Sequence, residues 1–176
     1  DRIAVGTGPG SFTGLRIGIA TARGLAQGRG LPLAGVGSLA ALARGISEHP
    51  EGGRRPALPV IDARRGQVFA ALYDPSGGER WPPLVAAPGE LAKRLAERDS
   101  APLAAGDGAV RFSAELEAVG ATVAPARDTI HRIAARHVCA LGEVAEATPP
   151  DQVEPLYLRP PDAKRWLERD RNSTSR

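Results

Sequence analysis

The sequence predicts an α/β protein made of two lobes, and three observations support this class. Residues 57–146 read as three strands followed by helices and strands in alternation. Residues 3–47 read as a strand, a helix, a strand and a helix. Between these two units lies the breaker-rich stretch His49-Pro-Glu-Gly-Gly-Arg-Arg-Pro56, which is typical of a boundary.

The first unit starts with a short apolar strand and a loop that holds four glycines and one proline between Gly6 and Gly14. Ser11 or Thr13 can cap the helix that follows, because a hydroxyl oxygen accepts a hydrogen bond from a free backbone N–H. Ser38 is expected to cap the second helix for the same reason. The expected elements are a strand at 3–6, a helix at 13–29, a strand at 31–36 and a helix at 38–46.

The second unit contains two hairpin-like connections, at residues 63–66 and 75–78, where glycine or proline favours a turn. The expected strands cover residues 57–62, 67–73, 79–85, 102–106 and 121–124. The expected helices cover residues 88–98, 109–119 and 128–146. A polar, proline-rich tail follows, and it contains Pro155-Leu-Tyr-Leu-Arg159.

The order of these elements favours one architecture. Three strands followed by alternating helices and strands is the order of an RNase H-like unit, and the first unit repeats its closing half. We therefore expect tandem RNase H-like lobes, as in the superfamily of sugar kinases, heat-shock ATPases and actin. The first lobe is expected to be incomplete, with its opening strands upstream of Asp1. The expected boundaries are residues 1–50 for the closing half of the first lobe, 51–150 for the second lobe and 151–176 for the tail.

Composition narrows the class of protein. The chain has 176 residues, of which 42% are hydrophobic, and one cysteine excludes a disulfide framework or a multi-cysteine zinc site. Without an apolar run of about 20 residues or a signal peptide, the expectation is a soluble cytoplasmic protein. Residues 1–70 hold nine basic and four acidic side chains, which suits RNA phosphates but is also explained by codon bias. Aromatic residues, at 4%, are too sparse for a base-stacking surface.

The glycine loop fails three spacing tests. No lysine follows Gly14 and no glycine stands five residues before it, so the loop is not a Walker A motif. The dinucleotide pattern that starts at Gly8 needs a glycine where Thr13 stands, and a nucleophile elbow at Ser11 needs glycines where Pro9 and Thr13 stand. Two roles for the loop stay open: nonspecific binding of an anion at the helix N-terminus, and a simple turn from strand to helix.

The helix after the loop carries small residues on two stripes. Glycine inside a helix costs up to about 1 kcal/mol relative to alanine, so the pattern calls for a compensating close contact with another backbone. That contact is either the chain's own sheet or a helix of a partner protein, with Arg16 and Arg23 at the rim. The stripes are Gly14, Gly18, Ala22 and Ala26, and Ala20, Gly24 and Gly28. The candidate partner-interface residues are Gly14, Arg16, Gly18, Ala22 and Arg23.

Four segments carry a family resemblance. GPGSFTGLRIGIATARGLA, GVGSLAALA, VIDARRGQVFAALYD and PLYLR resemble the bacterial TsaB (YeaZ) family, and the resemblance extends from Asp1 to about Lys164. It implies a tandem RNase H-like fold and a role in making threonylcarbamoyladenosine in tRNAs that read codons starting with A. It also implies a non-catalytic paralogue of the catalytic subunit TsaD, which forms a heterodimer with TsaD, is joined by the ATPase TsaE and reaches tRNA through that complex. A homodimer through the same surface is expected when TsaD is absent.

Asp62, Arg64 and Arg65 form a candidate vestigial phosphate loop. Active members of the superfamily have a D-x-G hairpin here, in which small residues let phosphate approach backbone N–H groups. Arginines stand at those positions in this chain, although an arginine side chain can itself bind phosphate. We therefore expect no cofactor and no catalytic residue, with an ATP-dependent kinase or ATPase as the alternative.

The histidines and the cysteine do not suggest a metal site. His131 and His137 are six residues apart on one predicted helix, which places them roughly 240° apart around its axis. Because they cannot converge on one ion, they and His49 are expected to be structural or solvated, and Cys139 is expected to be a small core residue. A metal-dependent, glycoprotease-like peptidase is therefore a weak alternative, and a generic tRNA-binding module is a further one.

Overall fold

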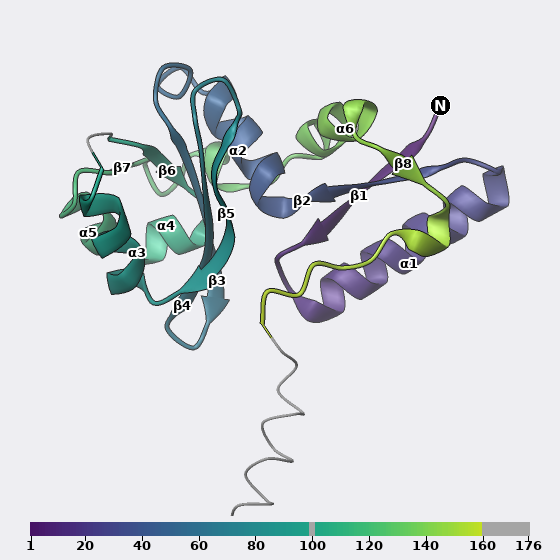
Figure 1. The fold of residues 1–176 in the computed structure, drawn as a ribbon, viewed down its shortest axis with the longest axis horizontal. Helices are drawn as coiled ribbons and strands as arrows, with labels where there is room; N and C mark the ends of the chain where they lie inside the picture. Colours follow the sequence, from purple (N-terminus) through teal and green to yellow (C-terminus); the bar gives the residue numbers. More distant parts are fainter. Residues whose placement is uncertain (99–100, 160–176) are drawn as a thin grey trace, which may run out of the picture.

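Two sheets lie side by side in the computed structural model, and helices pack on both faces of each (Figure 1). The structure describes residues 1–98 and 101–159, so most of the expected tail, residues 160–176, lies outside the described part. The strands are β1 (Ile3–Gly8), β2 (Leu33–Gly37), β3 (Ala57–Arg64), β4 (Gln67–Tyr73), β5 (Glu79–Ala86), β6 (Leu103–Ala105), β7 (Thr122–Val123) and β8 (Ala147–Thr148). The helices are α1 (Phe12–Arg29), α2 (Ser38–Glu48), α3 (Pro88–Ala96), α4 (Asp107–Arg111), α5 (Ser113–Glu117) and α6 (Ala135–Val144), with short 3-10 turns η1 (Thr129–His131) and η2 (Pro150–Gln152).

The larger sheet has five strands in the order β5-β4-β3-β6-β7. β3, β4 and β5 form an antiparallel meander, whereas β6 pairs parallel with β3, and β7 pairs parallel with β6. A meander on one side of the first strand and parallel strands on its other side is the RNase H-like arrangement. The fold class expected from the order of elements is confirmed.

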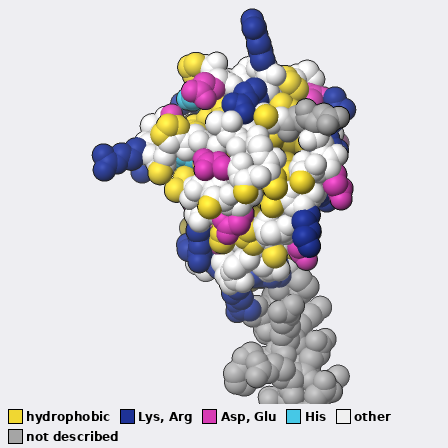
Figure 2. Space-filling model, turned by 90° about the vertical axis from the view of Figure 1, so that its left-hand side faces the viewer, with side chains coloured by type: hydrophobic (Ala, Val, Ile, Leu, Met, Phe, Trp, Pro, Cys, Tyr) yellow, Lys and Arg dark blue, Asp and Glu magenta, His cyan; other side chains and the backbone are white. Residues whose placement is uncertain are grey.

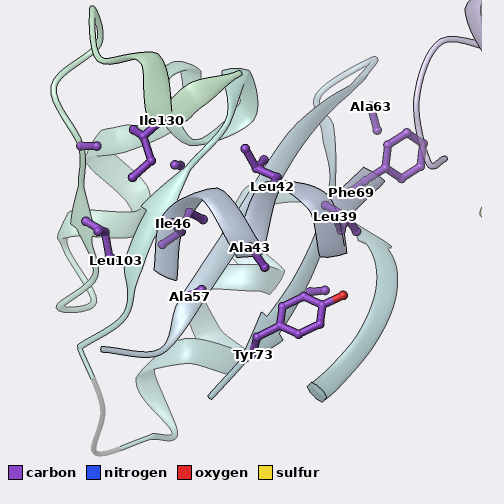
Figure 3. Packing of buried hydrophobic residues seen from close by; sticks show 13 residues of the cluster. Leu39, Leu42, Ala43, Ile46, Ala57, Ala63, Phe69, Tyr73, Leu103 and Ile130 are labelled. Atoms are coloured by element: carbon purple, nitrogen blue, oxygen red, sulfur yellow. The ribbon is translucent and has the colours of Figure 1, made fainter. Parts of the chain in front are cut away.

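Side chains of β3 and β4 alternate between two cores, as the period of a strand requires. Ala57, Phe69 and Tyr73 face α2, and Figure 3 shows them around the helix. Val60 and Leu72 point to the opposite face, where α3 and α5 cover them. Each fully buried leucine stabilises the fold by about 1.5–3 kcal/mol, so the leucines on both faces hold the sheet between its helices. Those leucines are Leu39, Leu42, Leu58, Leu72, Leu91, Leu95, Leu103 and Leu116.

The smaller sheet has three strands in the order β1-β2-β8. β1 and β2 are parallel, and β8 pairs antiparallel with β2 through only two residues, which is too short for a sequence pattern to reveal. α1 covers one face of this sheet and α6 covers the other (Figure 1). Gly142 lets α6 approach β1 closely, because a Cβ at that position would run into the side chain of Ala4.

Residues 135–148 return to the smaller sheet. α6 and β8 fall within the sequence range expected for the second lobe but pack on β1 and β2. α2, which lies in the first unit of the sequence, contributes its apolar face to the core of the larger sheet. The boundaries expected at residues 50 and 150 remain predictions.

Several local expectations were wrong. The helix expected at 109–119 is broken at Phe112, whose backbone leaves the helical region with φ at −117°. The helix expected at 128–146 begins only at Ala135, because the Asp128 side chain accepts the backbone N–H of Ile130 and starts the short turn η1 instead. Ser38 was expected to cap the second helix, but it is the first residue of α2. The cap position is taken by Gly37, which makes no side-chain cap. Cys139 is exposed on α6 and is not a core residue.

Candidate docking face and cleft

The glycine loop ends where Ser11 caps α1. The Ser11 hydroxyl oxygen accepts a hydrogen bond of 3.3 Å from the backbone N–H of Gly14, whereas Thr13 is already inside the helix. This bond gives one of the free N–H groups of the first turn a partner within the chain. The structure thus favours a strand-to-helix turn as the role of the loop.

The loop forms one wall of a cleft between the two sheets. The cleft has a volume of about 720 Å³. Its other walls are the start of the β3–β4 hairpin, the Asp107 side chain at the start of α4, and residues 156–159 of the C-terminal segment. The structure therefore brings the glycine loop and the candidate phosphate loop to the same place.

Asp62 is the central charged group of this cleft, and its carboxylate is already occupied. One oxygen accepts the backbone N–H of Arg64 at 2.8 Å, and the other accepts Nη1 of Arg111 at 2.8 Å. Burial opposes ionisation, but these bonds and the two guanidinium charges hold the pKa of the Asp62 carboxyl below its ordinary value. Asp62 is therefore a structural anion in this arrangement, with both oxygens in use.

The hairpin tip is poorly arranged to receive a phosphate. Arg64 and Arg65 both adopt left-handed backbone conformations, with φ at 63° and 54°, which disfavours side chains larger than glycine. The N–H of Arg64 bonds to Asp62 within the chain, and the Asp62 N–H donates to Asp107 Oδ1 at 2.9 Å. Two N–H groups of the hairpin therefore have intramolecular acceptors and do not point to a bound anion.

The two stripes of α1 face different directions. Ala22 and Ala26 are buried against Leu33 and Val153 in the chain's own small core. Ala20, Gly24 and Gly28 are exposed. Ala22 and Ala26 of the first stripe therefore serve packing within the chain, whereas the whole second stripe is open to another molecule.

Exposed apolar side chains accompany the second stripe. Ile17 is 62% exposed and Leu25 is 56% exposed, although both lie within a well-formed helix. A Cβ added at Gly24 or Gly28 would meet no atom within 4 Å, so the helix surface is open there. We call the surface formed by Ile17, Ala20, Thr21, Gly24, Leu25 and Gly28 the docking face.

The interface residues predicted from sequence differ in how exposed they are in the structure. Ala22 was a wrong choice as a contact residue, because it is buried against the sheet. Gly14 is exposed at the capped start of the helix, and Gly18 is half-buried beside open space. The sequence reasoning missed Ile17 and Leu25, although two isolated large apolar residues beside a stripe of small ones could have indicated an exposed face.

Arg16 and Arg23 hold another part of the same chain. Arg23 Nη2 donates to the carbonyl oxygens of Asp151 and Val153, at 3.1 and 2.6 Å. Arg16 Nε donates to the Tyr157 hydroxyl at 3.1 Å, and its guanidinium lies 4.0 Å from the centre of the Phe12 ring. Both arginines thus fix residues 153–159, which we call the strap, along one side of α1 (Figure 1).

The strap also reaches the cleft. The backbone N–H of Leu156 donates to the carbonyl oxygen of Thr7 at 2.8 Å, and Arg159 Nη1 donates to the Gln67 side chain at 3.3 Å. Leu156, Tyr157, Leu158 and Arg159 line the cleft wall. One segment therefore connects the docking face with the space between the sheets.

Each of the three histidines has a structural partner. His137 is buried and its Nε2 lies 3.0 Å from Glu48, His49 lies 3.4 Å from Asp128, and His131 accepts the Gly106 N–H through Nδ1. His131 Nε2 then faces the carbonyl oxygens of Ala124 and Pro125 as a donor. Among the described residues, no group of three or more histidine, cysteine, aspartate or glutamate side chains is placed to hold a metal ion.

The surface charge is mixed on the side of α3 and α5. Figure 2 shows basic and acidic side chains interspersed there, with apolar side chains between them. Such a face lacks the single-sign field that attracts nucleic acid. None of the described helices is both long and apolar enough to cross a membrane.

Comparisons of sequence and of structure identify known proteins that are similar to this chain. The family model described as "TsaD: tRNA N6-adenosine threonylcarbamoyltransferase" matches residues 1–154. The tRNA threonylcarbamoyladenosine biosynthesis protein TsaB of Escherichia coli is 44% identical over 81 residues, which are 46% of this chain and 34% of that protein. TsaB of Bacillus subtilis is 42% identical over 78 residues, which are 44% of this chain and 32% of that protein. The chain thus matches about a third of the length of these two relatives.

Two further comparisons extend over most of the chain. An uncharacterized protein of Mycobacterium tuberculosis is 35% identical over 166 residues, which are 93% of this chain and 66% of that protein. A crystal structure from Pseudomonas aeruginosa, described as similar to the peptidase YeaZ, superposes with a TM-score of 0.73 at 28% identity, covering 90% of this chain and 74% of the other. A structure of YeaZ from the same organism superposes with a TM-score of 0.70.

Proposed function

This chain belongs to the TsaB (YeaZ) family, and from that premise we propose that it is a non-catalytic subunit of the machinery that makes threonylcarbamoyladenosine in tRNA. Relatives named as tRNA threonylcarbamoyladenosine biosynthesis proteins match it in sequence, and the TsaD family model covers residues 1–154. The proposed role is to pair with the TsaD paralogue, with TsaE as a further partner and tRNA reached through the complex. Such a role belongs in the cytoplasm.

The observation that carries the pairing is the docking face of α1. Charged side chains normally occupy the solvent side of a helix, yet Ile17 and Leu25 are exposed here beside Gly24 and Gly28. Glycines inside a helix weaken it, and close approach of a second helix offsets that cost. An apolar face of this kind is better suited to contact with a partner helix than to exposure to water. Two copies of the chain can use it symmetrically when TsaD is absent.

The cleft supports the non-catalytic part of the proposal. Asp62 is engaged by Arg64 and Arg111, so it is not free to act as a general base or to orient a metal-bound phosphate. The arginines at the hairpin tip occupy the positions where small residues would let phosphate approach the backbone. The ATPase alternative predicts nucleotide binding in this cleft, and the peptidase alternative predicts a catalytic group that the described residues do not assemble.

Co-purification with the TsaD paralogue tests the pairing. Gly24→Trp and Ile17→Asp place bulk or charge on the docking face, and we expect either change to abolish capture of TsaD. Lys93→Trp is the matched control, because Lys93 is exposed on α3 in the other lobe. Ala22→Trp is unsuitable, since Ala22 is buried and its replacement would disrupt the fold. If the Gly24→Trp and Ile17→Asp variants capture TsaD normally, the docking face is not the surface that pairs with TsaD.

ATP binding tests the non-catalytic part. Titration of the isolated chain with ATP and magnesium should give no measurable binding at micromolar concentrations. Saturable binding together with turnover would favour the ATPase alternative, and Asp62→Asn would show whether the cleft is responsible.

A further inference from the structure

Arg16 lies where the docking face meets the cleft, and its guanidinium has unused capacity. It is exposed, it donates through Nε to the neutral Tyr157 hydroxyl, and it stacks on Phe12. Within the described part of the chain it forms no ion pair with a carboxylate. Nη1 and Nη2 are therefore available to a stronger acceptor than a phenol.

The charge of α1 indicates which acceptor fits. The helix carries Arg16, Arg23 and Arg29 and has no acidic residue. A groove of about 660 Å³ runs between α1 and the C-terminal segment, and Arg16, Ala20 and Gly24 line its helix side. A carboxylate can accept two parallel bonds from a guanidinium, which a single hydroxyl cannot do.

Tyr157 contributes both to the contact with α1 and to the wall of the cleft. Its ring lies 5.4 Å from that of Phe12, its hydroxyl holds Arg16, and it also lines the cleft. The adjacent Leu156 N–H bonds to Thr7, at the end of β1. A change in the position of Tyr157 therefore alters the cleft wall as well as the surface of α1.

We propose that the partner that docks on α1 presents a carboxylate to Arg16, which releases Tyr157 and moves the end of the strap, residues 156–159, away from the cleft. This inference rests on the proposed function and adds the chemistry of the contact and its consequence. A carboxylate that binds side-on accepts from Nε and one Nη together, so it takes the Nε donor away from the Tyr157 hydroxyl. Binding and strap release therefore share one free energy.

Two variants with opposite effects test the exchange. We expect Arg16→Gln to weaken the affinity for the TsaD paralogue about 10-fold, because a charge-assisted pair at the edge of an interface is lost. Tyr157→Phe keeps the ring but removes the competing hydroxyl, so it should tighten binding about 3-fold. Arg29→Gln, at the other end of α1, should change the affinity less than about 2-fold. Isothermal titration with full chains measures all four proteins.

Hydrogen exchange supplies the readout at the cleft. The amide of Leu156 should lose protection when TsaD is added to the wild type, because its bond to Thr7 breaks as the strap moves. An unchanged affinity of Tyr157→Phe, or a Leu156 amide that stays protected in the complex, overturns the exchange while leaving the pairing intact. Absence of any binding by the wild type overturns the proposed function and this inference together.

Discussion

Arg23 in α1 donates a hydrogen bond of 2.6 Å to the carbonyl oxygen of Val153, a residue 130 positions further along the chain. The same guanidinium nitrogen also donates to the carbonyl oxygen of Asp151, and the Val153 side chain is buried in the small core beneath α1. One helix of the smaller sheet thus fixes the chain at the point where the strap begins.

Replacing Arg23 should therefore destabilise the fold. Arg23→Ala removes two hydrogen bonds from a charged donor and leaves two carbonyl groups without that partner, and we expect the free energy of unfolding to fall by about 1–3 kcal/mol. Urea denaturation followed by circular dichroism measures the loss. Arg29→Ala is the control, because Arg29 is exposed in the last turn of the same helix. Equal stability of the two variants would show that the bonds to the strap contribute little.

Gly142 should be intolerant of any side chain. A Cβ at this position would clash with the side chain of Ala4, so α6 would have to move away from β1. We expect Gly142→Ala to lower the free energy of unfolding by about 1–3 kcal/mol, in spite of the better helix propensity of alanine. Cys139→Ala on the exposed side of α6 should change it by less than about 0.5 kcal/mol. A Gly142→Ala variant as stable as the wild type would mean that α6 is not tightly packed.

Much of the fold could be predicted from sequence because its elements have regular patterns. The continuous apolar run from Val68 to Tyr73 and the cap at Ser11 define a strand and a helix locally. Contacts between distant segments could not be predicted in this way. The pairing of β8 with β2 involves two residues, and the return of α6 to the first sheet depends on Gly142 meeting Ala4 across the sequence.

The candidate site also depends on contacts between distant segments, which the sequence could not predict. Small-residue spacing identified α1 as unusual, but spacing alone does not say which stripe faces the sheet. Ala22 was therefore chosen as an interface residue although it is buried, and the exposed Gly24 was placed on a stripe but not chosen. The partners of Arg16 and Arg23 lie in the strap, far along the chain. Only the three-dimensional structure reveals that these arginines hold the chain's own C-terminal segment.

The stability should depend on pH through Asp62. Burial opposes its ionisation, yet the bonds from Arg111 and from the Arg64 backbone lower the pKa of this carboxyl. A lowered pKa means that the stabilisation is present above the ordinary value of about 3.9 and is lost as the pH falls through the lower folded-state value. We expect Asp62→Asn to be less stable than the wild type by about 1–2 kcal/mol at pH 7, a figure reduced because Arg111 is half-exposed.

The difference between the two proteins should shrink in acid. As the pH falls below the ordinary carboxyl pKa and through the lower folded-state pKa of Asp62, the wild-type carboxyl becomes protonated and loses its advantage over the amide, so the two urea midpoints should converge. Unfolding curves at pH 7, 5 and 3 measure this trend. A constant difference at all three values would show that Asp62 acts through packing, with no contribution from its charge.

Gly24 should reveal whether the docking face evolved for a partner. A Cβ at this position meets nothing within 4 Å, and glycine inside a helix costs up to about 1 kcal/mol relative to alanine. Gly24→Ala should therefore stabilise the isolated chain by about 0.5–1 kcal/mol in urea denaturation. If a partner helix approaches the backbone there, the same methyl group keeps it at a distance, so the affinity for the TsaD paralogue should fall several-fold. Gly89→Ala, at an open position near the start of α3, is the control and should leave that affinity unchanged. A Gly24→Ala chain that is more stable and binds TsaD as tightly as the wild type would show that the glycine is not required for close helix packing.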